Sequence, residues 1–179
     1  MSKIGKINIS IPEKVKVLLT GSQISIEGPL GIRKMNIDLD IFEFKIMDGK
    51  EVSIKPKTIN DNTKRLWGMN RSLINNAIIG TSVGYEKVLE LSGVGYRASI
   101  KDKKLILQLG FSHDVEFSIP ENITINVEKQ TIIKIKGNDK QKVGLICSQI
   151  KSHRPPEPYK GKGIKEKGQY ILRKEGKKK

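Results

Sequence analysis

The chain carries one pattern of apolar residues twice, at an offset of 81 residues that places Val15 on Tyr96. Self-similarity at a fixed offset indicates a repeated structural unit. In both copies apolar positions alternate with polar ones, as in β-strands that bury one face. Ten apolar pairs share this register without gaps: Val15–Tyr96, Val17–Ala98, Leu19–Ile100, Ile24–Leu105, Ile26–Leu107, Phe42–Ile123, Phe44–Ile125, Ile46–Val127, Val52–Ile133 and Ile54–Ile135.

Turn-forming residues lie at matched places between these strands. Thr20-Gly21 aligns with Lys101-Asp102, and Asp48-Gly49 aligns with Lys129-Gln130. Gly and Asp accept the backbone conformations that tight turns require. The matched positions therefore predict equivalent β-hairpins in the two copies.

Each copy ends in a predicted helix. In the first, residues 58–62 offer N-caps, Gly80 is expected to end the helix, and Trp67 lies beside the apolar stripe and is expected in the core. In the second, Asn138 or Asp139 offers the N-cap. The apolar stripes comprise Leu66, Asn70, Leu73, Ile74, Ala77 and Ile78 in the first helix, and Val143, Ile146, Cys147 and Ile150 in the second.

These elements predict an α+β fold: two tandem copies of a small, mostly antiparallel β-sheet with one helix packed on a face, arisen by internal duplication. We expect an N-terminal module at residues 1–82, a C-terminal module at residues 83–152, and a basic loop and tail at residues 153–179.

Positive charge is concentrated at the end of the chain. The chain has 34 Lys and Arg against 19 Asp and Glu, a net charge of +15. Residues 151–179 alone hold 11 basic and 3 acidic side chains, which contribute +8 of that total. A concentrated basic segment predicts a polyanionic partner.

The sequence offers no catalytic constellation, and we expect a protein that is not an enzyme and needs no cofactor, metal or small-molecule substrate. His113 and His153 lie 40 residues apart, and Cys147 falls on the apolar stripe of its helix, as a small buried hydrophobe does. Gly93-Val94-Gly95 has no following helix to hold a phosphate and predicts a bulge or sharp bend. No apolar run has the roughly 20 residues of a membrane span.

The basic segment begins with a loop that combines proline, glycine, lysine and one tyrosine. Pro155, Pro156 and Pro158 stiffen it along an extended path, because each ring locks φ. Glycines at every second position of the Lys-Gly-Lys-Gly run allow the backbone to approach a surface while the lysines reach phosphates. Tyr159 can stack on a base. Residues 153–164 therefore predict docking on folded RNA, whereas the final six residues fit a solvated tail equally well.

Other basic residues have a simpler interpretation. Lys64, Arg65 and Arg71 lie on the first predicted helix. They could touch RNA, but most charged helix faces are solvated, and we favour that interpretation.

The string Pro156-Glu157-Pro158-Tyr159-Lys160-Gly161-Lys162-Gly163-Ile164 resembles the characteristic loop of a known family, that of the sixth protein of the large ribosomal subunit in its bacterial form. Gly93-Val94-Gly95-Tyr96-Arg97-Ala98 and the opening Ser2-Lys3-Ile4-Gly5-Lys6, followed by Ile11-Pro12, are similar to that family too. The resemblance covers essentially the whole chain. The abundance of Lys, Ile and Asn departs from many bacterial members and suggests an AT-rich genome, either bacterial or organellar.

The resemblance implies a structural constituent of the large ribosomal subunit that binds large-subunit (23S-type) rRNA. It further implies a place near the sarcin–ricin loop and the stalk base, where translation factors dock, beside neighbouring large-subunit proteins. Its localisation would be the bacterial cytoplasm or an organelle, with no membrane contact. The RNA contacts carried over are His153, Arg154, Tyr159, Lys160, Gly161, Lys162, Gly163 and Lys165, together with Arg173 and Lys174.

Two alternatives remain at this point. One is a free-standing RNA- or DNA-binding protein, which sedimentation separates from a ribosomal component because the latter travels with the large subunit. The other is an enzyme acting on nucleic acid, for which the sequence shows no clustered carboxylates.

Overall fold

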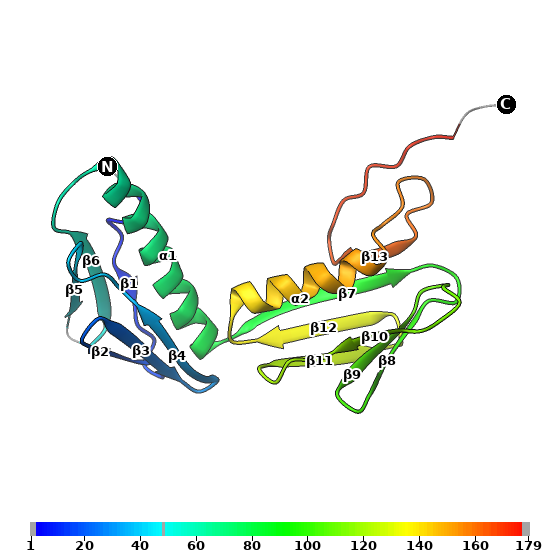
Figure 1. Cartoon of the computed structure of the whole chain (residues 1–179), viewed down its shortest axis with the longest axis horizontal. Coiled ribbons are helices and arrows are strands. Elements are labelled where there is room, and N and C mark those ends of the chain that lie inside the picture. Colours follow the sequence, from blue (N-terminus) through cyan, green and yellow to red (C-terminus); the bar gives the residue numbers. More distant parts are fainter. Residues whose placement is uncertain (1–2, 48, 177–179) are drawn as a thin grey trace. The chain divides into compact units, whose positions relative to one another are not determined.

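A computed structural model of the chain describes residues 3–47 and 49–176. Ser2, Asp48 and the last three lysines, named in the sequence patterns above, lie outside the described residues. The chain divides into two compact units, Met1–Gly84 and Tyr85–Lys179. Each unit contains antiparallel strands and one helix (Figure 1).

The first unit has two sheets and a helix around one core. Its elements are β1 (Ile9–Ser10), β2 (Lys16–Thr20), β3 (Gln23–Gly28), β4 (Gly31–Asn36), β5 (Phe42–Met47), β6 (Glu51–Pro56) and α1 (Asp61–Ser82). The strands form the sheets β1-β6-β5 and β2-β3-β4. Buried residues from both sheets and from α1 belong to one apolar cluster, because each sheet and the helix bury only one face.

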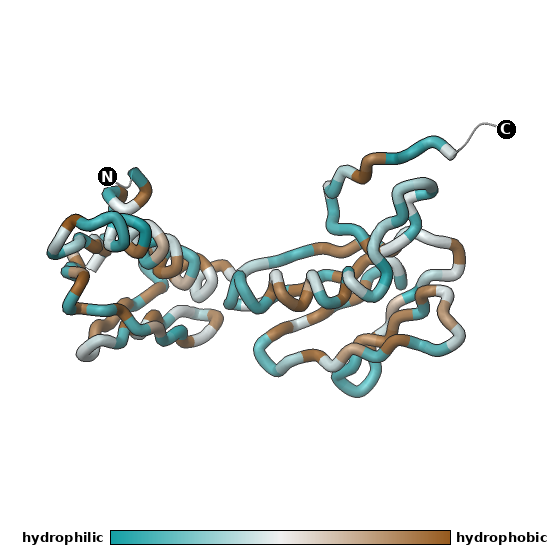
Figure 2. Tube along the Cα trace, turned by 45° about the horizontal axis from the view of Figure 1, so that its top comes forward, coloured by the Kyte–Doolittle hydropathy of each residue, from teal (hydrophilic) through white to brown (hydrophobic). Residues whose placement is uncertain are grey.

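The second unit repeats this arrangement and adds one strand. Its elements are β7 (Tyr85–Ser92), β8 (Arg97–Lys101), β9 (Lys104–Gln108), β10 (Val115–Ser118), β11 (Ile123–Glu128), β12 (Ile132–Gly137), α2 (Lys140–His153) and β13 (Gly163–Glu166). The strands form the sheets β11-β12-β7-β13 and β10-β9-β8. Figure 2 shows apolar residues recurring along these strands and α2, whose buried side chains form the second core.

The expected fold of two duplicated sheet-plus-helix modules is confirmed, with each module's strands divided between two sheets. The strands β2 and β8, β3 and β9, β5 and β11, and β6 and β12 each begin 81 residues apart. The hairpin turns match as well: Gly21 and Asp102 have φ angles of 58° and 47°, and Gly49 and Gln130 have 66° and 58°.

One strand pair departs from the gap-free register. Met35 of β4 pairs with Ile24, whereas its counterpart Phe117 of β10 pairs with Leu105. The offset between Met35 and Phe117 is therefore 82. The additional residue lies in the connection between β9 and β10, which is longer than the tight Gly28–Gly31 turn of the first unit.

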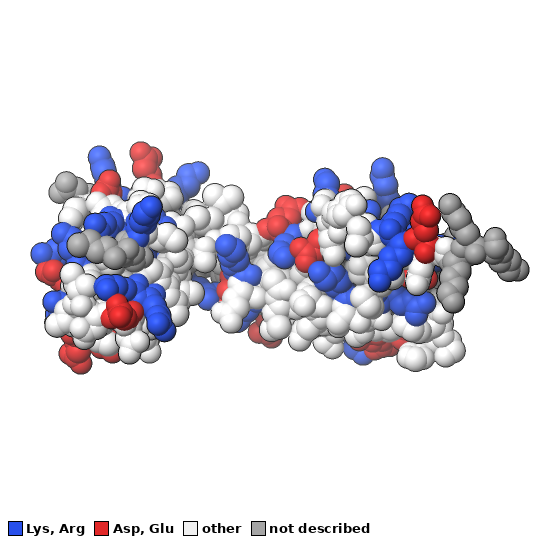
Figure 3. Space-filling model, turned by 90° about the horizontal axis from the view of Figure 1, so that it is seen from above, with Lys and Arg blue, Asp and Glu red and all other residues white. Residues whose placement is uncertain are grey.

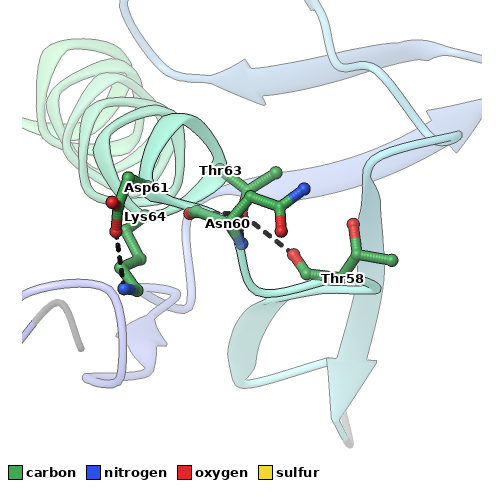
Figure 4. Close-up of polar contacts among 5 residues, drawn as sticks. All are labelled: Thr58, Asn60, Asp61, Thr63 and Lys64. Atoms are coloured by element: carbon green, nitrogen blue, oxygen red, sulfur yellow. Dashed lines mark hydrogen bonds and ion pairs between the residues drawn. The ribbon is translucent and has the colours of Figure 1, made fainter.

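Helix α1 begins near a capping network (Figure 4). The backbone N–H of Asn60 donates to Thr63 Oγ1 at 2.7 Å, and the Thr63 hydroxyl donates to the Thr58 carbonyl at 2.9 Å. The expected capping region is confirmed. Such bonds satisfy backbone groups that have no partner within the helix.

The expected end of α1 at Gly80 is wrong by two residues. The helix continues to Ser82, and the N–H groups of Val83 and Gly84 both bond to the Ile79 carbonyl. Gly84 has a φ of 81°, the left-handed conformation that favours glycine directly after a helix. The helix therefore ends at Ser82, and Gly84, the second glycine of this region, follows its C-cap.

The apolar stripe predicted for α1 is partly misplaced. Leu66 and Leu73 are 36% and 41% exposed, whereas Trp67 is buried and donates its indole N–H to the Ile54 carbonyl at 2.7 Å. The helix presents more apolar residues than its buried face accommodates, so spacing alone did not locate that face. The expectation that Trp67 belongs to the core is confirmed.

The prediction for α2 is confirmed throughout. Asp139 caps the helix by accepting a hydrogen bond from the Gln141 N–H at 2.9 Å. All four residues of the predicted stripe are buried: Val143, Ile146, Cys147 and Ile150.

Candidate nucleic-acid interface

The basic loop, residues 154–162, lies between α2 and β13 in the second unit. Its ends are joined, because the Ile164 N–H donates to the Arg154 carbonyl at 2.9 Å. Within it, the Glu157 N–H donates to the Lys162 carbonyl at 2.7 Å and the Gly161 N–H donates to the Glu157 carbonyl at 3.0 Å. The loop is therefore a closed, internally bonded turn, whereas the prolines had predicted an extended path.

Gly161 in the loop and Gly163 at the start of β13 both contribute to how the loop packs. Gly163 has a φ of 136°, and a Cβ there would come within 2.6 Å of the Pro155 carbonyl oxygen and 2.7 Å of Pro156 Cα. Gly161 is buried with a φ of 71°. Both glycines are buried and adopt positive φ angles, a backbone conformation that favours glycine.

The loop's cations point into solvent. Tyr159 is 54% exposed, and Lys160 and Lys162 are exposed. His153, the last residue of α2, and Arg154 are also exposed. Figure 3 shows Lys and Arg side chains side by side over this part of the second unit. Figure 2 shows the loop in the colours of polar and neutral residues. This surface can attract phosphates.

Lys165 differs from these lysines. It lies on β13 and forms an ion pair with Glu90 of β7 at 3.2 Å. Its side chain is 34% exposed. Lys165 therefore reaches the surface, but Glu90 already balances part of its charge.

The C-terminal tail lies against the loop. The Lys174 N–H donates to the Pro158 carbonyl at 2.9 Å, and a Cβ at Gly161 would lie 3.6 Å from the Arg173 guanidinium. Both tail residues are exposed. A cavity of about 400 Å³ lies between the tail, the loop and β7. The residues that line it are Ser92, Gly161, Lys165, Gln169, Tyr170, Ile171 and Arg173. The structure thus brings Arg173 and Lys174 together with the loop residues.

Glu166 connects the strand after the loop to two other elements, which the sequence did not reveal. Its carboxylate oxygens lie 3.1 Å from Lys87 of β7 and 3.1 Å from Lys151 of α2. Hydrogen bonds from Lys87 and then Lys151 lower the pKa of Glu166. The carboxylate is thereby held in its charged form and ties β13 to the helix.

Two neighbouring loops share one buried aromatic ring. A Cβ at Gly93 would come within 2.8 Å of the Tyr96 ring, and one at Gly110 would lie 3.5 Å from it. Gly93-Val94-Gly95 is therefore the turn between β7 and β8, in agreement with the bend expected there. Tyr96 joins this turn to the β9–β10 loop.

Phe111 of the β9–β10 loop reaches the base of the basic loop. The Arg154 guanidinium carbon lies 5.0 Å from the centre of the Phe111 ring. His113 stacks beside Phe111 at 6.4 Å between ring centres. Neither aromatic residue was among the predicted contacts. In the sequence, the only indication of these two residues is that a phenylalanine and a histidine occur in a loop that contains a glycine.

Several of the other residues considered in the sequence have contacts or burial within the fold. Lys64 pairs with Asp61 at 2.8 Å, and Arg71 Nε donates to the Ile7 carbonyl at 3.2 Å. Cys147 is fully buried, and burial raises the pKa of its thiol. Among the described residues, no group of three or more His, Cys, Asp or Glu side chains is placed to hold a metal ion. Neither described helix has the length and apolar composition needed to cross a membrane.

Comparison with known proteins identifies the family. The family model described as ribosomal protein L6 matches residues 92–167. Proteins named large ribosomal subunit protein uL6 are 46% identical in Sphingopyxis alaskensis, 46% in Paramagnetospirillum magneticum and 48% in Caulobacter vibrioides. Each alignment covers 100% of both chains. The identity over the full length shows that this chain belongs to the ribosomal protein L6 family.

Proposed function

We propose that this member of the ribosomal protein L6 family binds large-subunit rRNA through the basic loop, residues 154–162, and the adjoining tail. The family consists of non-enzymatic structural components of the large ribosomal subunit. The proposed contacts are the half-buried Lys165 and the exposed side chains of His153, Arg154, Tyr159, Lys160, Lys162, Arg173 and Lys174. Gly161 and Gly163 act in the proposal by shaping the loop.

The observation that carries the proposal is a rigid loop whose cations remain available. Three backbone hydrogen bonds close the loop, while Lys160 and Lys162 remain exposed. Cations held in a fixed arrangement can neutralise phosphates and release their counterions. They also lose less conformational freedom on binding than cations on a flexible tail.

Removal of loop charge tests this proposal. Lys160→Ala/Lys162→Ala should lower the affinity for protein-free large-subunit rRNA and flatten its salt dependence, by roughly one unit of the logarithmic slope for each phosphate that the variant no longer neutralises. Lys34→Ala/Lys50→Ala removes the same charge from exposed positions of the first unit and serves as the control. Equal slopes for the two double variants would contradict the loop's role.

We also propose the finer location that the family resemblance implies, near the sarcin–ricin loop and stalk base of a bacterial-type large subunit. The relatives described above are bacterial proteins. Crosslinking from Tyr159 and Lys162 in assembled subunits tests the location. Crosslinks to the rRNA at the base of the stalk would support it, and crosslinks confined to distant rRNA or to no rRNA would contradict it.

A further inference from the structure

The β9–β10 loop adds a group of planar side chains to the base of the basic loop. Phe111 is 41% exposed, and Arg154 and His113 are exposed. The Arg154 guanidinium lies over the Phe111 ring at 5.0 Å, and the rings of Phe111 and His113 are inclined by only 22°. A guanidinium, a phenyl ring and an imidazole from two distant parts of the chain thus meet on one surface.

Packing of the fold does not account for the position of Phe111. The ring lies outside the apolar core of the second unit, whereas Tyr96 packs beneath the same loop, near Gly110. Aromatic residues and arginine are enriched in binding interfaces relative to the rest of the protein surface. The contact with Arg154 is a modest interaction at an exposed site and leaves much of the ring accessible.

We propose that Phe111, His113 and Arg154 form a platform on which one unpaired RNA base stacks. The inference rests on the proposed rRNA binding and extends it from phosphate contacts to a base contact. Aromatic rings and arginine guanidinium planes are the groups on which proteins stack splayed-out bases.

The charge around the platform is mixed, because it includes the Arg154 cation and, on the β9–β10 loop, an exposed carboxylate. The β9–β10 loop contributes the exposed carboxylate of Asp114, which accepts a hydrogen bond from Gln108 at 3.3 Å. A carboxylate repels phosphate but not a neutral base. Lys160 and Lys162 lie on the neighbouring loop and supply the phosphate contacts. In this proposal Phe111, His113 and Arg154 contact the base, and Lys160 and Lys162 contact the RNA backbone.

The first test compares affinity with salt dependence. Phe111→Leu keeps an apolar side chain but removes the flat ring, and should weaken binding of the full chain to protein-free large-subunit rRNA by roughly five-fold or more. The slope of affinity against salt should be unchanged, because no cation is removed. Leu145→Ala alters another exposed apolar residue of the second unit and is the control.

A second test separates stacking from a role in positioning Arg154. If Phe111 only orients the guanidinium, Phe111→Leu will have no effect on affinity in an Arg154→Ala background. The platform predicts a remaining reduction in affinity. Phe111→Trp should retain affinity, and its fluorescence should be quenched when the rRNA binds, because a base lies against the indole. The platform would be overturned if Phe111→Leu had no effect on affinity in the Arg154→Ala background. It would also be overturned if Phe111→Trp bound the rRNA with normal affinity but showed no quenching.

Failure of the platform and failure of rRNA binding by the loop give different results. A normal affinity for Phe111→Leu beside a flattened slope for Lys160→Ala/Lys162→Ala would remove the platform alone. An unchanged slope for the lysine variant would remove the proposed function, whatever the result at Phe111.

Discussion

Gly163 lies against Pro155 so closely that a Cβ atom at position 163 would come within 2.6 Å of the Pro155 carbonyl oxygen. The contact brings the two ends of the basic loop together, next to the hydrogen bond between Ile164 and Arg154. The shape of the loop therefore depends on backbone packing, and its charged side chains take no part in closing it.

Gly163→Ala should destabilise the second unit by about 1–3 kcal/mol, because a Cβ there meets backbone and because the φ of 136° is unfavourable for alanine. Urea unfolding measures the free-energy change. Gly168→Ala provides the matched control, since Gly168 also has a positive φ, 81°, but a Cβ there meets nothing within 4 Å. Equal destabilisation by the two variants would show that conformational strain alone accounts for the effect.

Glu166→Gln should weaken the attachment of β13 and lower stability near neutral pH by about 0.5–1 kcal/mol, a range suited to ion pairs that remain about one-third exposed. Lys87 and Lys151 lower the pKa of Glu166 in the folded chain. Its contribution is therefore present above the unfolded pKa of about 4.3 and is lost as the pH falls through the lower folded pKa.

Urea unfolding of the wild type and of the Glu166→Gln variant from pH 7 to pH 2.5 measures this pH dependence. The difference between wild type and Glu166→Gln should be constant near neutrality and shrink in acid. Glu121→Gln removes another, exposed carboxylate of the second unit and should show a smaller difference. A difference in unfolding free energy between wild type and Glu166→Gln that grew as the pH fell would contradict the lowered pKa of Glu166.

The Cys147 thiol should react with a thiol reagent at least about 100-fold more slowly in the native chain than in urea. It is fully buried on α2, and burial raises its pKa, so the reactive thiolate is scarce and inaccessible. Labelling kinetics followed by mass spectrometry give both rates. Rapid labelling of the native chain would show that α2 leaves the sheet more readily than its packing implies.

Gln130→Gly should stabilise the second unit by about 0.5–1 kcal/mol. Gln130 has a φ of 58° in the β11–β12 turn, where the first unit has Gly49 with a φ of 66°. Glycine adopts this conformation without the steric cost of a Cβ. The control is Gln141→Gly, which makes the same change within α2 and should destabilise by about 1 kcal/mol. Urea unfolding distinguishes the two signs.

Alternation and turn chemistry made the fold largely predictable. Strands with one buried face have a two-residue period that survives in both copies, as Ile24 and Leu105 illustrate. The face of α1 was harder to predict, since Leu66 and Leu73 satisfy a helical period while facing outward. Whether these two leucines are buried depends on which side of α1 the sheets cover. That arrangement is a property of the assembled unit.

The basic loop itself was evident from composition, but its neighbours were not. Lysines and prolines stand next to one another in sequence around Tyr159. In contrast, Phe111 and Arg154 are far apart in sequence and meet only after the strands and the helix between them have folded. The need for glycine at position 163 could not be predicted from the sequence either. The close contact of Gly163 with Pro155 arises only when β13 returns along β7.

Strand β13 follows both helices and the other described strands in chain order, and it pairs along β7, the first strand of its unit. During synthesis, a nascent chain that has not yet extended past Glu166 can form α2 but has no returning strand to close the loop. Its lysines would then be presented without a defined geometry. The closed geometry of the basic loop is thus acquired late in translation, when the rest of the unit is already able to fold.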